Sequence, residues 1–178
     1  MLSLNLGKTQ YFMERRSFLE TSAIVGLGTS IMPGQLINMN SKKVDDVINL
    51  GIIGTGDRGS GLINIIKEFP QFKVIALCDI IPFRLESAVK KLDYQVDKYK
   101  DYEKLLSNNN IDAVIIATPL SMHYKMALAA MEAGKHIYCE KTMTYQIREA
   151  IDLTQKAKLS NKVFQVGHQY RYLPLYDK

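Results

Sequence analysis

Two hydrophobic patterns alternate along the chain from residue 47 onward. Continuous apolar runs of strand length lie at 47–54, 73–80, 112–119, 135–140 and 162–168. Between them, apolar residues recur at helical spacing in the segments 60–69, 82–92, 101–108, 121–134 and 144–161. Strands that are apolar along their whole length are buried on both faces, as in a parallel sheet covered by helices. The pattern therefore predicts an α/β fold with a doubly wound parallel sheet and helices on both faces.

The composition of the chain limits its size class and its expected partners, but it does not identify a function. The chain has 178 residues, enough for one domain with a core of ordinary size, and 47% of them are hydrophobic. The formal charge of +5 comes from scattered basic residues, so we expect no nucleic-acid partner. Cys78 and Cys139 lie far apart with no CxxC or Cys/His cluster, so no metal site is expected and both cysteines are predicted to pack in core strands.

The stretch "INLGIIGTGDRGSGLINII" contains a glycine turn between the first strand and the first helix. Gly54, Gly56 and Gly59 form the pattern G-x-G-x-x-G. The first glycine permits a tight turn, the second lets the backbone approach a pyrophosphate, and the third lets helix and strand pack closely. Free N–H groups at the helix start then face the phosphates, so we predict a dinucleotide site that includes Asp57 and Arg58. The alternative is a glycine turn that only packs the chain.

Asp79 ends the second predicted strand, 20 residues after Gly59. A carboxylate in this position accepts hydrogen bonds from the adenosine ribose hydroxyls and repels a 2′-phosphate. Arg58 and Arg84 could soften that repulsion. The sequence therefore predicts NAD as the cofactor, with NADP as the less favoured alternative.

Two later stretches add a family resemblance. "ATPLSMHYKMALAAMEAGKHIYCEK" (117–141) and "VGHQYRYLP" (166–174), together with the glycine turn and Asp79, resemble the glucose–fructose oxidoreductase / inositol dehydrogenase / MocA (Gfo/Idh/MocA) family. The resemblance covers about residues 47–178. It implies a Rossmann dinucleotide-binding domain and an NAD(P)-dependent oxidoreductase that acts on a small sugar, cyclitol or polyol.

The family pattern "TPxxxH" falls on Thr118, Pro119 and His123. In the family the following loop, here Leu120 to His123 with Ser121, runs beside the nicotinamide half of the cofactor. The resemblance therefore implies that these five residues contact the cofactor.

The family pattern "EKP" falls on Glu140 and Lys141, with Thr142 in place of the proline. Glu140 and Lys141 are implied in the cofactor site, and the family's lysine lies between nicotinamide and substrate. A lysine ammonium can hydrogen-bond the hydroxyl oxygen that loses its proton as hydride leaves the carbon, so Lys141 is the expected catalytic residue. The alternative is an ordinary surface lysine.

The last predicted strand is followed by "HQYR". By resemblance, His168 contacts the cofactor and Arg171 contacts the substrate. A satisfied interior histidine is the alternative for His168. His136 lies inside a strand, where we expect a structural role.

The family has a second α/β domain that carries the substrate pocket. Residues 47–167 are predicted to form the Rossmann domain, and 168–178 the start of a truncated substrate domain, so the second C-terminal α/β domain is expected to be absent. The chain alone is then an incomplete enzyme, and its full-length form is expected to be a homo-oligomer. Two alternatives stay open: an exported relative that retains and recycles NAD to process glycosides, and a non-catalytic NAD-binding remnant.

Residues 1–33 are predicted to be an export signal of the twin-arginine type. Arg15 and Arg16 precede a short apolar, glycine-rich stretch that is too short to span a membrane stably. Residues 34–46 read as a polar linker. The prediction is export to the periplasm or beyond, or a cytoplasmic location if the signal is not used; the alternative is a disordered tail with a chance arginine pair.

Overall fold

A computed structural model describes residues 47–169 as a single alternation of strands and helices. The pattern predicted from hydrophobicity is confirmed over this range. The elements are β1 (Ile48–Ile53), α2 (Asp57–Ile66), β2 (Phe72–Cys78), α3 (Pro82–Val89), β3 (Asp97–Tyr99), α4 (Tyr102–Leu106), β4 (Ala113–Ile116), α5 (Leu120–Glu132), β5 (His136–Glu140), α6 (Ile147–Leu159) and β6 (Phe164–Gly167). The export signal, the linker and Arg171 lie outside the described residues.

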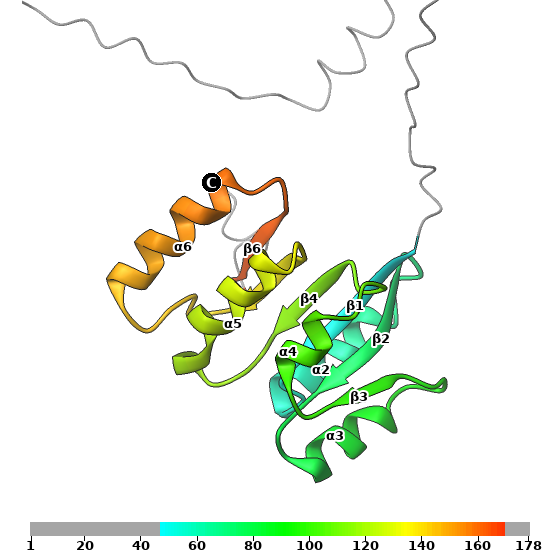
Figure 1. Ribbon diagram of the computed structural model, residues 1–178. Coiled ribbons are helices and arrows are strands. Elements are labelled where there is room, and N and C mark those ends of the chain that lie inside the picture. The colour runs from blue at the N-terminus through cyan, green and yellow to red at the C-terminus, as the bar shows by residue number, and fades with distance from the viewer. Residues whose placement is uncertain (1–46, 170–178) are drawn as a thin grey trace, which may run out of the picture. The chain divides into compact units, whose positions relative to one another are not determined.

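The six strands form one parallel sheet in the order β3-β2-β1-β4-β5-β6 (Figure 1). The chain starts at the centre with β1, extends to one side through β2 and β3, and then crosses to β4 on the other side of β1. This order, with its reversal between β1 and β4, is that of a Rossmann fold. The predicted fold class is confirmed.

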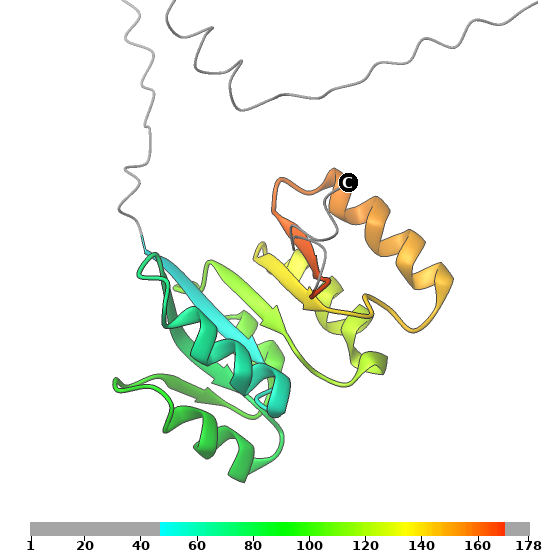
Figure 2. The same ribbon diagram turned by 180° about the vertical axis from the view of Figure 1, so that it is seen from behind.

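Each face of the sheet has its own buried core. On one face, Leu62 and Ile63 of α2 and Leu85 of α3 pack against strand residues such as Ile52; these helices are in front in Figure 2. On the other face, residues of α4, α5 and α6 pack against the opposite sides of the same strands, with α4 and α5 in front in Figure 1. Burial on both faces explains why the strands are continuously apolar.

The structure corrects the sequence prediction in three places. β3 was missed, because its three residues Asp97–Tyr99 are mostly polar and pair only with β2 at the sheet edge. α2 begins at Asp57 rather than at residue 60, so Gly59 lies inside the helix. The segment Leu120–His123, a loop according to the family resemblance although the hydrophobic pattern predicted a helix from residue 121, is the first turn of α5.

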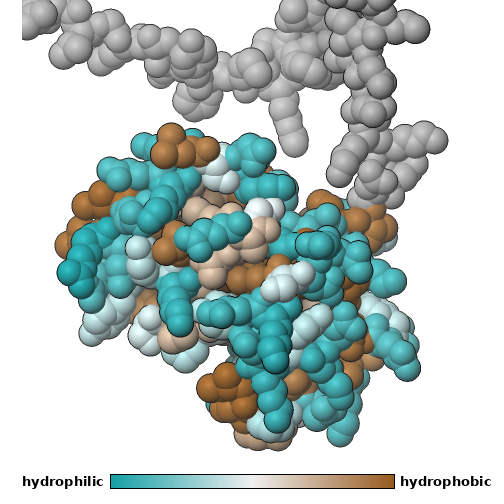
Figure 3. All heavy atoms as spheres, viewed as in Figure 1, coloured by the Kyte–Doolittle hydropathy of each residue, from teal (hydrophilic) through white to brown (hydrophobic). Residues whose placement is uncertain are grey.

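The surface of the described region is mixed. In Figure 3 apolar residues form several separate patches among hydrophilic ones. Some strongly exposed apolar residues lie near the ends of elements, including Ile80 and Phe83 after β2 and Leu159 at the end of α6. No helix within residues 47–169 has the length and hydropathy needed to cross a membrane.

Candidate functional site

The predicted site residues come from five different segments but gather at one edge of the sheet. The strands are all parallel, so their carboxyl ends lie at the same edge, where open α/β sheets bind ligands. Gly54 N–H donates to the Cys78 carbonyl at 2.8 Å, and Ala117 N–H donates to the Ile53 carbonyl at 2.9 Å. These bonds bring the ends of β1, β2 and β4 together, beside the reversal of strand order.

The three glycines of the turn are required for two different reasons. Gly54 has φ +89°, and a Cβ there would lie 2.6 Å from the Ala117 carbonyl oxygen. A Cβ on Gly59 would overlap the Gly54 carbonyl oxygen. Packing within the chain therefore explains both residues. A Cβ on Gly56 would meet only Nη1 of Arg84, at 3.8 Å, so its open side remains available to a ligand at the start of α2.

Asp79 is buried, with 8% of its surface exposed, and its carboxylate is held in place. Oδ2 accepts hydrogen bonds from the Thr55 N–H at 2.8 Å and the Thr55 hydroxyl at 3.1 Å. Oδ1 accepts from the Ile81 N–H at 2.9 Å. A carboxylate has about four acceptor positions, so one on Oδ1 is left for a ligand hydroxyl. Sequence reasoning missed Thr55, although its place inside the glycine turn was a usable signal.

The two arginines near the glycine turn have different partners. The Arg58 Nε donates to Glu140 Oε1 at 2.7 Å, and Nη2 lies 2.7 Å from the same oxygen. This hydrogen bond raises the pKa of Arg58 above its usual value. Arg84 is exposed, lies over the Phe83 ring at 5.9 Å, and faces Gly56. Of the two, Arg84 is therefore the arginine that remains near the turn to meet a phosphate.

Glu140 is the acceptor of a small polar cluster at the end of β5. It is only 5% exposed. Besides Arg58, the Tyr138 hydroxyl donates to Glu140 Oε1 at 3.2 Å. Burial, followed by the nearby Glu140 charge, raises the pKa of Tyr138. Tyr138 was also missed from the sequence, because its chemistry depends on an arginine 80 positions earlier.

His123, one of the predicted cofactor contacts, is buried, with 1% of its surface exposed. Its Nδ1 lies 2.8 Å from the Thr142 carbonyl oxygen and its Nε2 lies 2.9 Å from the Thr118 carbonyl oxygen. Both ring nitrogens are engaged by the chain itself, and the cofactor contact expected for His123 stays a prediction. Pro119 and Ser121, by contrast, are exposed at the start of α5.

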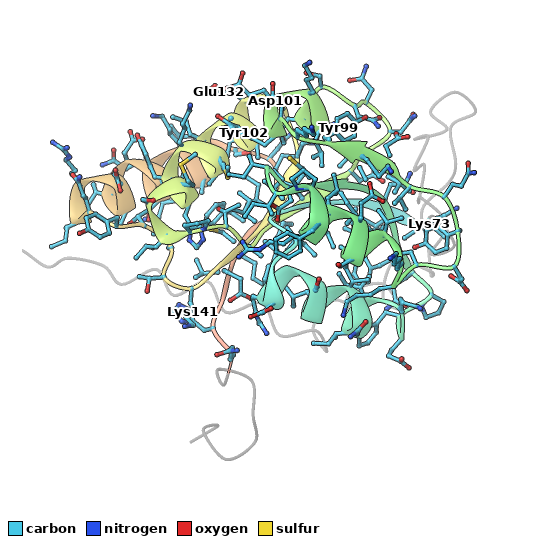
Figure 4. All side chains as sticks on the ribbon, turned by 90° about the horizontal axis from the view of Figure 1, so that it is seen from below. Lys73, Tyr99, Asp101, Tyr102, Glu132 and Lys141 are labelled. Carbon is cyan, nitrogen blue, oxygen red and sulfur yellow. The ribbon has the colours of Figure 1, made fainter. Side chains whose placement is uncertain are left out.

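Lys141 directly follows β5 and is exposed (Figure 4). Within residues 47–169, none of the three ion pairs involves it. Glu140 of β5 pairs with Gly167 of β6, so the exposed residues that follow the two strands, Lys141 and His168, lie at the same edge. Both are available to a ligand, whereas Glu140 is buried.

Other features of the described region lie away from this edge. Cys78 and Cys139 are buried strand residues, as predicted, and burial raises the pKa of each thiol to about 12. A depression of about 370 Å³ between α4 and α5 is lined by residues such as Glu103, Ala129 and Glu132. It contains none of the predicted site residues and lies at the opposite edge of the sheet, so it is not the candidate site.

Comparison with known proteins identifies the family. The model of the Gfo/Idh/MocA oxidoreductase family, described as an NAD-binding Rossmann fold, matches residues 48–168. This chain belongs to the Gfo/Idh/MocA family. The match runs from the first residue of β1 to the residue after β6, so the whole described sheet is the family's NAD-binding Rossmann domain.

Relatives of this Gfo/Idh/MocA domain include enzymes of two kinds. An inositol 2-dehydrogenase/D-chiro-inositol 3-dehydrogenase of Lactiplantibacillus plantarum is 31% identical over 73% of this chain and 38% of its own length. A glycosyl hydrolase family 109 protein of Shewanella amazonensis is 32% identical over 84% of this chain and 38% of its own length. The chain thus spans less than two fifths of the length of these relatives.

Solved structures match in the same region. The scyllo-inositol dehydrogenase of Lactobacillus casei, solved with bound NAD(H) and scyllo-inositol, has a TM-score of 0.68 and 29% identity. The match covers 74% of this chain and 39% of that one. The fold of this Gfo/Idh/MocA domain is therefore shared with a structure whose cofactor is NAD(H).

Proposed function

We propose that this chain forms the cofactor half of an oxidoreductase that moves hydride between NAD and a hydroxyl-bearing carbon of a sugar or polyol. The observation that carries the proposal is the open side of Gly56. Packing accounts for Gly54 and Gly59, whereas the open side of Gly56, the N-cap of α2, leaves the backbone accessible to a ligand at the start of that helix.

The residues at this edge fit a dinucleotide. No side chain caps the start of α2 beside Gly56, so the N–H groups of its first turn can bind the diphosphate. Asp79 has one acceptor position left, suited to a ribose hydroxyl. Thr118, Pro119 and Ser121 line the start of α5 and would lie along the nicotinamide half. When bound, NAD supplies the ring carbon that accepts or returns the hydride.

A buried carboxylate supports a preference for NAD over NADP. A 2′-phosphate beside Asp79 would set two negative charges against each other in a site with little water. Arg58 is held by Glu140 and does not offset that repulsion. Arg84 is the available counter-charge, so we expect residual NADP binding to depend on Arg84.

Lys141 is proposed as the catalytic residue for the substrate hydroxyl. Its exposed ammonium group follows the strand end at the nicotinamide side, where it can stabilise the oxygen that loses its proton. His168 would contact the cofactor from the adjacent strand end, and Arg171 would contact the substrate. The substrate class, a sugar or polyol, is supported by the inositol dehydrogenases among the relatives.

A second candidate is a glycoside-processing enzyme that retains NAD and recycles it within each catalytic cycle. Its support is the match to the glycosyl hydrolase family 109 protein, which covers 84% of this chain against 73% for the inositol dehydrogenase. A third candidate is an NAD-binding protein without turnover. Release of a glycosyl product without net NAD reduction would favour the second candidate, and tight binding without any turnover would favour the third.

The test is titration of the 178-residue chain with NAD by calorimetry, using a matched pair of glycine variants. Gly56→Val should lower NAD affinity by about 1–3 kcal/mol, the usual cost of overfilling a packed contact. Gly61→Ala is the control, because a Cβ on Gly61 of the same helix meets nothing within 4 Å. Absence of NAD binding by the wild-type chain would overturn the proposal, and equal affinities of the two variants would remove Gly56 from the site.

We also propose export by the twin-arginine route and, for the full-length form, assembly as a homo-oligomer. The export proposal is supported by Arg15 and Arg16 ahead of the apolar stretch. Replacing both arginines with lysine should retain the protein in the cytoplasm, because the receptor reads the arginine pair itself. Cell fractionation measures this, and an unchanged distribution of the double variant would contradict it.

A further inference from the structure

We infer that Arg58 and His123 are positioning residues that hold the two neighbours of Lys141, and so fix this lysine relative to the dinucleotide site. The inference rests on the proposed function, in which Lys141 is the catalytic residue. Lys141 itself is exposed, and none of the three ion pairs among residues 47–169 involves it. The residues on either side of it are each bonded to a different helix.

The first anchor is on the N-terminal side of Lys141. Glu140 is 5% exposed and receives both Nε and Nη2 of Arg58 on one carboxylate oxygen, at 2.7 Å each. Arg58 is the second residue of α2, so its backbone belongs to the turn that faces the diphosphate. The ion pair therefore connects the phosphate end of the site to the residue before Lys141, across 82 positions of sequence.

The second anchor is on the C-terminal side of Lys141. His123, in the first turn of α5, lies between the carbonyl oxygens of Thr142 and Thr118. A carbonyl only accepts hydrogen bonds, so each contact needs an N–H on the ring. A ring protonated on both nitrogens donates to both carbonyls, and a neutral ring donates to one. In either state the ring fills the space between the β4–α5 connection and the residue after Lys141.

Together the anchors give a reason for the buried Glu140 carboxylate and the buried His123 ring at an edge that also carries exposed residues such as Lys141. Catalysis at a hydroxyl needs the ammonium group within hydrogen-bonding reach of the reacting oxygen, and a shift of about 1 Å is costly. A flexible lysine stem on an unanchored loop would not keep that distance. Arg58 and His123 touch neither substrate nor the reacting atoms in this arrangement; they act through Glu140 and Thr142.

Two sets of variants test the anchors without leaving a buried charge unpaired. Arg58→Met with Glu140→Gln removes the ion pair as a unit, because Arg58→Met alone would leave a buried carboxylate without its partner. His123→Phe keeps the ring shape but removes both nitrogens, and His123→Gln can restore one N–H. Arg148→Met, an exposed arginine at the start of α6, is the matched control.

The first readout needs no cofactor. Amide hydrogen exchange of residues 141–144 is measured in the 178-residue chain by mass spectrometry. We expect faster exchange in His123→Phe and in the double variant, partial recovery in His123→Gln, and wild-type exchange in Arg148→Met. Exchange of this segment at the wild-type rate in both anchor variants would overturn the inference, whether or not the chain binds NAD.

The second readout follows the lysine itself. Lysines are reductively methylated with a ¹³C label, and the Lys141 signal is assigned by its loss in Lys141→Arg. Adding NAD should shift the Lys141 signal in the wild type, and this shift should be lost in the anchor variants although they still bind NAD. Lys73, which lies over Tyr94 far from Lys141 in Figure 4, provides the unresponsive control signal.

The two readouts separate the inference from the proposed function. No NAD binding by the wild type defeats the proposed function, and the exchange experiment still decides the anchors. NAD binding with an unchanged Lys141 response in both anchor variants defeats the inference and leaves the proposed function standing. Circular dichroism confirms that each variant is folded, and His123→Gln provides a milder change if His123→Phe is not.

Discussion

The two halves of the candidate site are built in different ways. The adenosine half consists of the glycine turn Gly54–Gly59 and Asp79, and its internal bonds from Thr55 to Asp79 link two consecutive strands. The reactive half consists of Thr118–His123 and Glu140–Thr142, and its key contact runs back to Arg58 across 82 positions. The first half is organised by backbone geometry, and the second by long-range side-chain contacts.

This difference in construction predicts which property of the protein a substitution in each half should affect. In the adenosine half, a substitution should alter cofactor affinity and the choice between NAD and NADP. In the reactive half, a substitution at Lys141 or at its anchors should leave cofactor affinity nearly intact and alter the position or chemistry of Lys141. Three predictions test this contrast, from the largest expected effect to the smallest.

The largest effect is expected from Lys141→Ala in a form of the protein that turns over substrate. Turnover should fall by about 10²–10⁴-fold, the range for loss of a positioned proton-transfer or oxyanion-stabilising group. NAD affinity should stay nearly the same, because the adenosine half is untouched. Stopped-flow measurement of hydride transfer and NAD titration check the two parts.

Lys158→Ala, at an exposed position on α6, is the matched control for that experiment and should turn over normally. Normal turnover of Lys141→Ala as well would reduce Lys141 to an ordinary surface charge. A large loss of NAD affinity would instead erase the contrast between the two halves.

A smaller effect is expected from Asp79→Ala. Loss of hydrogen bonds to a charged group should weaken NAD binding by about 1–3 kcal/mol, and removal of the negative charge should improve NADP relative to NAD. Parallel titration with both cofactors measures the ratio. If the ratio of NAD to NADP affinity does not change, Asp79 does not contact the ribose.

Asp79 also holds Thr55 inside the glycine turn, so a control must separate that role from ribose binding. Thr55→Val removes the 3.1 Å hydroxyl bond to Asp79 but keeps the carboxylate and the 2.8 Å backbone bond. We expect Thr55→Val to weaken both cofactors alike and to leave their ratio unchanged. Of these two variants, only Asp79→Ala should change the ratio of NAD to NADP affinity.

The smallest effect concerns the two cysteines, each of which directly precedes a residue of one half of the site. Cys78 precedes Asp79 and Cys139 precedes Glu140, and burial raises the pKa of both thiols from 9.0 to about 12. Alkylation requires the thiolate, so near pH 8 the folded protein should react only through local opening. We expect the His123→Phe variant to speed labelling of Cys139 more than that of Cys78, measured by mass spectrometry of the two peptides.

The same pKa values predict a loss of stability in alkaline solution. An unfolded thiol releases its proton above about pH 9.0, whereas the folded thiol keeps it up to about pH 12, so the unfolded state is favoured as pH rises through this window.

Equal labelling of both cysteines in the His123 variant would indicate that the two halves open together and would contradict the contrast.

Much of the fold and of the adenosine half could be predicted from the sequence because the signals are local. The strand Ala113–Ile116 is apolar throughout and Ile48–Ile53 is apolar except for Asn49, since both faces of the sheet are covered. The spacing of Gly54, Gly56 and Gly59 follows from the shape of one turn. By contrast, β3 carries only three mostly polar residues at an edge, where no pattern marks it.

The sequence by itself determined which residues stand at the carboxyl edge of the sheet, because parallel strands bring their ends together whatever the side chains do. Only the tertiary structure decided the partners of their side chains. It paired Arg58 with Glu140 rather than leaving it free for a phosphate, and it buried His123 between two carbonyls rather than leaving it exposed to a cofactor. The reason is physical: a pattern along the chain records burial and backbone shape, whereas the partner of a charged side chain depends on which distant segment folds against it.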